Sequence, residues 1–107
     1  MIIDYQGIDE QVKAQFKGGD GEMLSRGMAC DGMRLMLNRL TPGSSIGYHT
    51  HTDDMEVMYI LSGNGHYDMD GVREDIKAGQ AHYCPKGHSH AMYNDGEEDL
   101  VFFAIVK

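Results

Sequence analysis

The sequence is short of basic residues, of cysteine and of long apolar runs, and each shortage excludes a class of function. The 107 residues include 9 Lys and Arg against 17 Asp and Glu, which gives a formal net charge of −8 at pH 7. No Lys/Arg cluster is present that could neutralise the phosphates of a nucleic acid or of an anionic membrane. The predicted partner is therefore a small-molecule ligand, with no nucleic acid and no membrane.

The cysteines are too few and too widely spaced for a disulfide scaffold. Cys30 and Cys84 are the only two, and neither belongs to a Cys-x-x-Cys pair. The first residues, MIIDYQGIDEQ, lack the basic and apolar regions of a secretion signal, and no apolar run reaches membrane-spanning length. We expect reduced thiols and a cytoplasmic protein.

The length and the local patterns predict one all-β domain. A chain of 107 residues has room for a single core. Residues 7–17 form a polar segment whose conformation the sequence leaves undetermined. Elsewhere, short apolar or alternating segments are separated by turn signals. The predicted strands include residues 1–5, 22–29, 33–40, 66–69, 72–76, 81–84, 90–93 and 100–106, together with one strand around each of the two motifs described below. Such a series is typical of a sandwich or barrel, and jelly-roll closure would leave few exposed strand edges.

The C-terminal segment from Leu100 to Val106 is apolar on both faces of its predicted strand. One face can fill the barrel, and the other needs cover from outside. Two sources of cover are open, a second copy of the chain or the N-terminal segment of the same chain. A homodimer is the preferred interpretation.

Side chains that suit a metal ion are concentrated between residues 43 and 63. His49 and His51 are two positions apart in an extended segment, so their imidazoles face the same side. A polar turn follows, and Glu56 then begins a second strand. A hairpin would bring Glu56 beside the two histidines.

A fourth candidate ligand, His90, lies on the strand that follows the tight turn at Pro85 and Gly87. From there it could enter the barrel opposite the first three side chains. Three imidazoles and one carboxylate suit one borderline divalent metal ion per chain, and Fe, Mn, Ni, Zn and Cu all remain open.

These two stretches resemble the paired motifs of the cupin family. Residues 43–63 contain a glycine, five residues, His-x-His, four residues, a glutamate, six residues and a glycine. In the second stretch, 79–94, the residues at the intervals of the companion motif are Gly79, Pro85, Gly87, His90 and Asn94. The motifs and the fifteen residues between them make up about half of the chain.

The resemblance implies a fold and a ligand set. It implies a single cupin domain over residues 1–107, an all-β double-stranded β-helix or jelly-roll barrel of six to eight strands. It also implies that a metal ion is bound by His49, His51, Glu56 and His90.

The resemblance leaves the reaction open, because cupins include oxygenases, lyases, isomerases, decarboxylases, storage proteins and ligand-binding sensors. The preferred interpretation is a metalloenzyme that acts on a small organic metabolite. Oxygenase or lyase chemistry is favoured over sugar-phosphate isomerisation, because cationic residues are scarce near the motifs. The alternative is a non-catalytic protein that binds a metal or a small molecule.

His88 is the predicted catalytic residue. On a continuing strand its ring would share a face with His90 and could exchange protons with a metal-bound substrate; the alternative is a solvated side chain. Six further residues are predicted to line the cavity: Met58, Ile60, His82, Cys84, Met92 and Arg39. The alternatives are a satisfied core histidine at His82 and an exposed or ion-paired Arg39.

Overall fold

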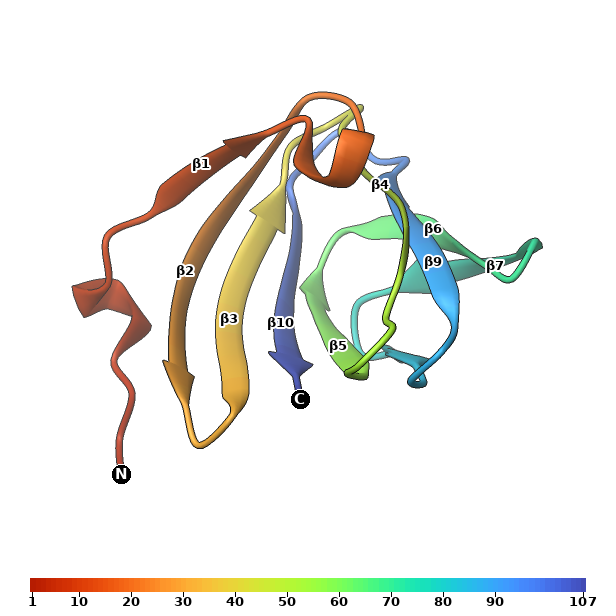
Figure 1. Ribbon diagram of the computed structural model, residues 1–107. Coiled ribbons are helices and arrows are strands. Elements are labelled where there is room, and N and C mark those ends of the chain that lie inside the picture. Colours follow the sequence, from red (N-terminus) through yellow and green to blue (C-terminus); the bar gives the residue numbers. More distant parts are fainter.

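The computed structural model describes residues 1–107 and consists of two antiparallel sheets that face each other (Figure 1). The larger sheet has the strand order β1-β2-β3-β10-β5-β8, and the smaller has the order β4-β9-β6-β7. The strands are β1 (Gln11–Ala14), β2 (Glu22–Cys30), β3 (Met33–Leu40), β4 (Ser45–Thr50), β5 (Glu56–Ser62), β6 (Asn64–Met69), β7 (Val72–Lys77), β8 (Ala81–Cys84), β9 (Ser89–Asn94) and β10 (Leu100–Val106). The predicted jelly-roll is confirmed, with ten strands in place of six to eight.

The predicted strand at residues 1–5 is wrong. The chain there is irregular and leads into a short 3-10 helix, η1 (Tyr5–Gly7). The edge strand β1 lies instead inside the polar segment whose conformation the sequence left open, and a second 3-10 helix, η2 (Phe16–Gly18), follows it. β1 forms because it pairs with β2 from Gln11 to Ala14, a contact that its own polar sequence does not specify.

Two Asp-Gly pairs make the tight turns between consecutive strands. Asp31 and Gly32 have φ angles of 51° and 74°, and Asp70 and Gly71 have 51° and 83°. Two consecutive left-handed residues define the two-residue hairpin whose twist matches that of the flanking strands. These turns fix the registers of β2 with β3 and of β6 with β7.

The core lies between the sheets, on the inward faces of β3, β5 and β10. Leu40, Ile60, Leu100 and Phe102 are fully buried there. Burial of each such side chain contributes about 1.5–3 kcal/mol to stability. Because β5 starts at Glu56 and continues into this core, the packing also fixes the backbone from which the Glu56 side chain projects.

The outward face of the larger sheet is also apolar. Two rows of paired residues cross it, and together they form what we call the outer sheet face: Leu37, Phe103 and Tyr59 in one row, and Leu35, Ile105, Val57 and Tyr83 in the other. The N-terminal segment covers part of this face, since the Tyr5 ring packs edge-on against Phe103 with centroids 5.6 Å apart. Both apolar faces predicted for the C-terminal segment are therefore real.

The structure also bears on the cysteines and on membrane-spanning helices. Cys30 and Cys84 are both free thiols, so there is no disulfide. Neither helix has the length and apolar character needed to cross a membrane.

Candidate metal centre

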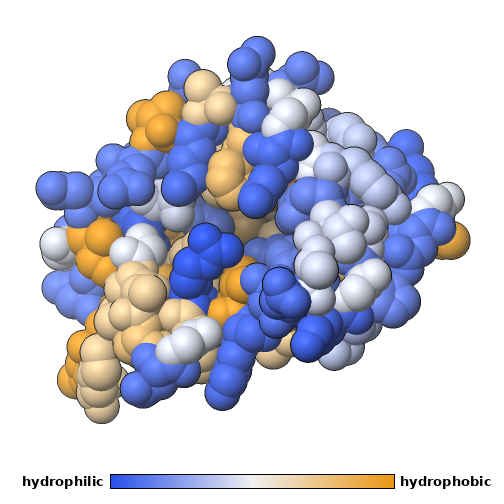
Figure 2. Space-filling model, viewed as in Figure 1, coloured by the Kyte–Doolittle hydropathy of each residue, from blue (hydrophilic) through white to orange (hydrophobic).

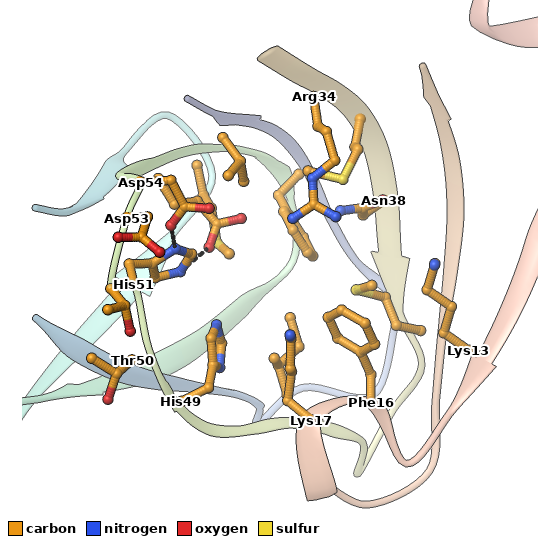
Figure 3. Close-up of a pocket in the computed structure, with 18 residues that line it drawn as sticks. Lys13, Phe16, Lys17, Arg34, Asn38, His49, Thr50, His51, Asp53 and Asp54 are labelled. Atoms are coloured by element: carbon orange, nitrogen blue, oxygen red, sulfur yellow. Dashed lines mark hydrogen bonds and ion pairs between the residues drawn. The ribbon is translucent and has the colours of Figure 1, made fainter. Parts of the chain in front are cut away.

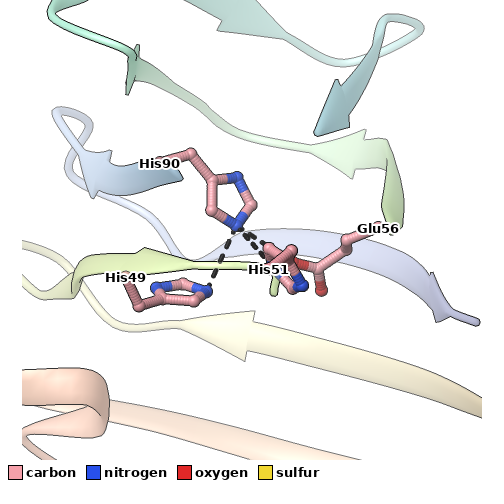
Figure 4. A group of neighbouring side chains, drawn as sticks. All are labelled: His49, His51, Glu56 and His90. Carbon is pink, nitrogen blue, oxygen red and sulfur yellow. Dashed lines mark hydrogen bonds and ion pairs between the residues drawn. The ribbon is translucent and has the colours of Figure 1, made fainter. Parts of the chain in front are cut away.

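Strands of both sheets bring the four predicted ligands together at one end of the barrel (Figure 4). His49 of β4 and His90 of β9 are cross-strand partners. His51 follows the end of β4, and Glu56 is the first residue of β5. One ligand atom from each residue lies within 4.8 Å of all the others, so the cluster could hold a metal ion.

A β-bulge in β4 turns His49 toward this cluster. The pairing with β9 changes between Ile46 and His49, where β4 carries one extra residue. Ile46 faces the core, and the extra residue allows His49, three positions later, to face the same side. Gly47, within the bulge, allows η2 to pack directly against β4, because a Cβ atom there would lie 2.0 Å from the carbonyl oxygen of Lys17.

Each histidine of the cluster is oriented through its Nδ1 atom. The Nδ1 of His49 lies 2.7 Å from the carbonyl oxygen of Gly47, and the Nδ1 of His51 lies 2.7 Å from Oδ1 of Asp54. With acceptors at those distances, both Nδ1 atoms carry a proton, and each Nε2 is left to face the cluster.

The third ring, that of His90, is oriented by another histidine. Its Nδ1 lies 3.0 Å from Nε2 of His82, whose ring stacks on buried Tyr67 with centroids 3.7 Å apart. Burial and the nearby charge of His90 lower the pKa of His82 to about 4. His82 is therefore neutral at pH 7 and can accept the proton of His90 Nδ1.

The atoms that face one another are all electron donors. The Nε2 atoms of His51 and His90 are 2.9 Å apart, those of His90 and His49 are 3.2 Å apart, and Oε1 of Glu56 lies 3.2 Å from Nε2 of both His51 and His90. Three nitrogen lone pairs and a carboxylate repel one another at such distances unless positive charge lies among them. Protons or a metal ion can supply that charge, and the donor set suits a borderline divalent ion.

The electrostatics of the cluster agree with this need for positive charge. Burial alone would raise the pKa of Glu56, but hydrogen bonds from His51 and His90 and their charge outweigh it and lower the pKa to about 2. The same Glu56 hydrogen bond, helped by Asp54, raises the pKa of His51 against the effect of burial. Burial lowers the pKa of His49.

The cluster opens into a cavity of about 320 Å³ between the two sheets (Figure 3). In the space-filling view, hydrophilic side chains surround a hollow near the centre of the molecule (Figure 2). His49, His51 and Glu56 line one wall of the cavity, and Met58 adds an apolar surface beside them. Met58 is thus among the residues that line the cavity, where the sequence analysis expected it.

The cavity also has basic side chains that the sequence analysis missed. Lys13, Lys17 and Arg34 line it, from β1, η2 and β3. They lie before both motifs in the sequence, so the scarcity of cations near the motifs was a misleading signal. Lys13 and Lys17 reach the site because the N-terminal segment folds onto the barrel, and Arg34 reaches it because β3 turns that position inward.

Three hydrophobic or sulfur-bearing residues predicted to line the cavity lie elsewhere. Ile60 and Met92 are packed in the core cluster, and Cys84 is fully buried with its Sγ near the carbonyl oxygen of Pro85. Each faces the barrel interior. The interior at those positions is filled by side chains and does not belong to the cavity.

The polar predictions His82, Arg39 and His88 also fall outside the cavity lining. His82 contacts the Nδ1 side of the His90 ring, away from the cluster. Arg39 is on the outward face of β3, because Asn38 and Leu40 take the inward positions; it forms ion pairs of 2.7 Å with Glu10 and 2.9 Å with Asp99.

The premise for His88 as a catalytic residue, a ring on the ligand face, is wrong. β9 begins only at Ser89, and the His88 ring turns outward to pair with Asp70 of the β6–β7 hairpin. The hydrogen bond from His88 lowers the pKa of Asp70. His88 therefore has an established partner away from the cluster.

The low pKa of Glu56 gives a pH prediction for the protein in the presence of a chelator. Because this pKa is about 2 when folded against an ordinary value of 4.5, the ionised carboxylate contributes stability above pH 4.5 that is lost as the pH falls toward 2. In Glu56→Gln, the free energy of unfolding should fall less steeply across that window. Urea denaturation at a series of pH values checks this, and equal slopes for the two proteins would contradict it.

Comparisons with known proteins agree with this geometry. The family model for the cupin domain matches residues 36–106. A Thermotoga maritima protein named oxalate-binding protein is 34% identical over 112 residues, covering 99% of this chain and 93% of that protein. A Thermotoga maritima crystal structure described as a predicted oxalate decarboxylase has a TM-score of 0.92 and 31% identity, covering 99% of this chain and 97% of the other.

The fold is shared more widely. The polyketide cyclase RemF from Streptomyces resistomycificus has a TM-score of 0.80 at 18% identity, with 99% of this chain and 78% of that chain covered. At that identity the likeness concerns the fold alone. Because the cupin-domain match spans more than half of the chain, and a relative more than 30% identical spans nearly all of it, the protein belongs to the cupin family.

Proposed function

We propose that this chain binds one divalent metal ion through His49, His51, Glu56 and His90, and through it holds a small organic carboxylate in the adjoining cavity. The observation that carries the proposal is the orientation of the three rings. Each Nδ1 has an acceptor, so each Nε2 lone pair faces the Glu56 carboxylate and the same central point. Fe, Mn, Ni, Zn and Cu all suit this donor set.

The bound ion would act as a Lewis acid that attracts and polarises a carboxylate oxygen. The chain's own residues prepare the site for it. Asp54, Gly47 and His82 hold the rings in one tautomer, and the fold keeps Glu56 ionised and buried. This preorganisation avoids the cost of ordering long side chains when the ligand set forms.

A carboxylate ligand is supported by charge and by the relatives. The cavity is lined by three cationic side chains, Lys13, Lys17 and Arg34, and a divalent ion would add further positive charge. The Thermotoga maritima relative at 34% identity is named for oxalate binding. Three carboxylates, Asp53, Asp54 and Glu56, also line the cavity and balance these cations, so the bound ion would supply the net positive charge.

The metal assignment predicts that His51→Ala loses most of its metal while the barrel stays folded. The fold rests on an apolar core that does not include the cluster, so removing one ligand should weaken metal binding far more than stability. Metal content of the purified protein by elemental analysis, with circular dichroism for the fold, checks this.

A matched control is His66→Ala. His66 lies on β6, stacks on Tyr93 and pairs with Asp95, outside the cluster. This variant should keep its metal. Full metal occupancy in the folded His51→Ala protein would refute the ligand assignment.

A second candidate function is catalysis on the same ligand, by oxygenase or lyase chemistry. The observation that favours it is the open cavity beside the metal cluster, in which a bound acid would have room to react. The description of the solved relative as a predicted oxalate decarboxylase points the same way.

Catalysis predicts that metal-loaded protein releases CO2 from small organic acids or consumes O2 with them. His51→Ala should lose this activity together with its metal. CO2 release and O2 uptake, measured across small organic acids with each plausible metal, distinguish the two functions. Tight binding of an acid with no turnover under any metal would leave the binding function alone.

We also propose that two copies of the chain associate through the outer sheet face. Tyr59 and Tyr83 are 46% and 55% exposed there, beside the partly buried Phe103 and Ile105. The Tyr5 contact covers only part of this surface. A contiguous apolar sheet face of this kind marks an interaction surface, and a two-fold pair is the simplest way to bury it.

The dimer predicts twice the chain mass by light scattering at micromolar concentration. Tyr59→Glu should give a monomer, because it would bury a charge in the interface. Tyr48→Glu, at a tyrosine 55% exposed on β4 of the other sheet, is the matched control and should stay dimeric. A monomeric wild-type protein would contradict the proposal.

A further inference from the structure

Two polar side chains of β3, Arg34 and Asn38, project into the cavity, which His49 of β4 and His51 just after β4 also line (Figure 3). Glu56 of β5 lines it as well. We infer that Arg34 and Asn38 form a second binding point for the ligand, so that the ligand is a dicarboxylate with a spacer between its two acidic groups. This inference rests on the proposed function, because the metal ion is taken to hold the other end.

Asn38 has a buried amide oxygen that is not hydrogen-bonded. It is 4% exposed, and its Oδ1 is the one buried side-chain oxygen or nitrogen in the chain without a hydrogen-bond partner. A buried amide left without a hydrogen bond costs free energy. At a cavity wall, such a group indicates a point where the side chain contacts a bound ligand. A carboxylate can only accept hydrogen bonds, so Asn38 would meet it through the Nδ2–H groups of the same amide, with the side chain turned over toward the cavity.

Arg34 is the arginine that has no acidic partner within the chain. The chain has four arginines, and the other three, Arg26, Arg39 and Arg73, all form ion pairs with acidic side chains. Arg34 forms none, although the chain has nearly twice as many acidic as basic residues. Its planar guanidinium is suited to grip a carboxylate with two hydrogen bonds.

The two lysines of the cavity differ from Arg34. The Nζ atoms of Lys13 and Lys17 each lie 5.6 Å from the centre of the Phe16 ring, so they rest on an aromatic surface at the cavity edge. They contribute positive charge without the geometry of a carboxylate clamp. Arg34 is therefore the side chain that can select the second acidic group.

The charge of the lining also fits a doubly charged ligand. Three cations, Lys13, Lys17 and Arg34, balance three carboxylates, Asp53, Asp54 and Glu56. A bound divalent ion would leave the cavity with a net charge that a dianion neutralises. The net positive charge of the metal-loaded cavity and its two binding points thus both favour a dicarboxylate.

The size of the cavity indicates that the two acidic groups are separated. A volume of about 320 Å³ is within the range of pockets for organic ligands. Oxalate, whose carboxylates are joined directly, would fill a small part of it while bound at the metal. A spacer allows the far carboxylate to reach Arg34 and Asn38 while the near one stays at the ion.

The experiment is calorimetric titration of Mn²⁺-loaded protein with acetate, oxalate, succinate and glutarate. The wild-type protein should bind succinate or glutarate at least about tenfold more tightly than acetate and more tightly than oxalate. Arg34→Gln should keep its metal and lose that advantage, with a far smaller loss of affinity for acetate than for the longer diacids. Asn38→Leu should lose part of it. Arg73→Gln, which removes the same charge from the exposed edge strand β7, should behave as wild type.

The outcomes separate this inference from the function on which it rests. Absence of Mn²⁺ binding, or of carboxylate binding to the loaded protein, would overturn the proposed function itself. Intact metal and acetate binding with no preference for the longer diacids, or with equal losses in Arg34→Gln and Arg73→Gln, would overturn the second binding point alone.

Discussion

The site depends on the requirement that every buried imidazole nitrogen has a partner. At the barrel end, three Nδ1 atoms find acceptors in a backbone carbonyl, an aspartate and a second histidine. That choice leaves three Nε2 atoms and the Glu56 carboxylate within 4.8 Å of one another. The resulting concentration of electron donors needs positive charge, and this need explains both the low pKa of Glu56 and the raised pKa of His51.

The barrel makes this arrangement possible because its core holds the ligand strands rigidly. β5 carries Glu56 at its start and Met58 and Ile60 in the packed interior, so the core holds the backbone from which the Glu56 side chain projects. The bulge in β4 turns His49 inward, and Gly47 within it allows η2 to pack closely against β4. A single extra residue in one strand thus sets the direction of the His49 ring.

Although the net charge of the chain is −8, three cationic side chains line the cavity. Most arginines are paired with acidic side chains, whereas the cations of the cavity are left free to meet a ligand. Residues 7–17, a polar segment whose conformation the sequence left undetermined, supply two of these cations, Lys13 and Lys17, from β1 and η2. The N-terminal residues therefore complete the cavity and, through Tyr5, cover part of the outer sheet face.

The sequence alone determined the family, the all-β fold and the four side chains that form the cluster. It could do so because strand alternation, Asp-Gly turns and motif spacing are local properties of the chain. The bounds of β3, β8 and β10 were predicted for the same reason. The tertiary structure decided which face of β3 points inward, and it placed Asn38 in the cavity and Arg39 in an outward ion pair. It also turned His88 away from the cluster, placed His82 behind His90 and brought distant cations to the cavity. These features depend on pairing between segments far apart in the chain, and local patterns carry no record of such contacts.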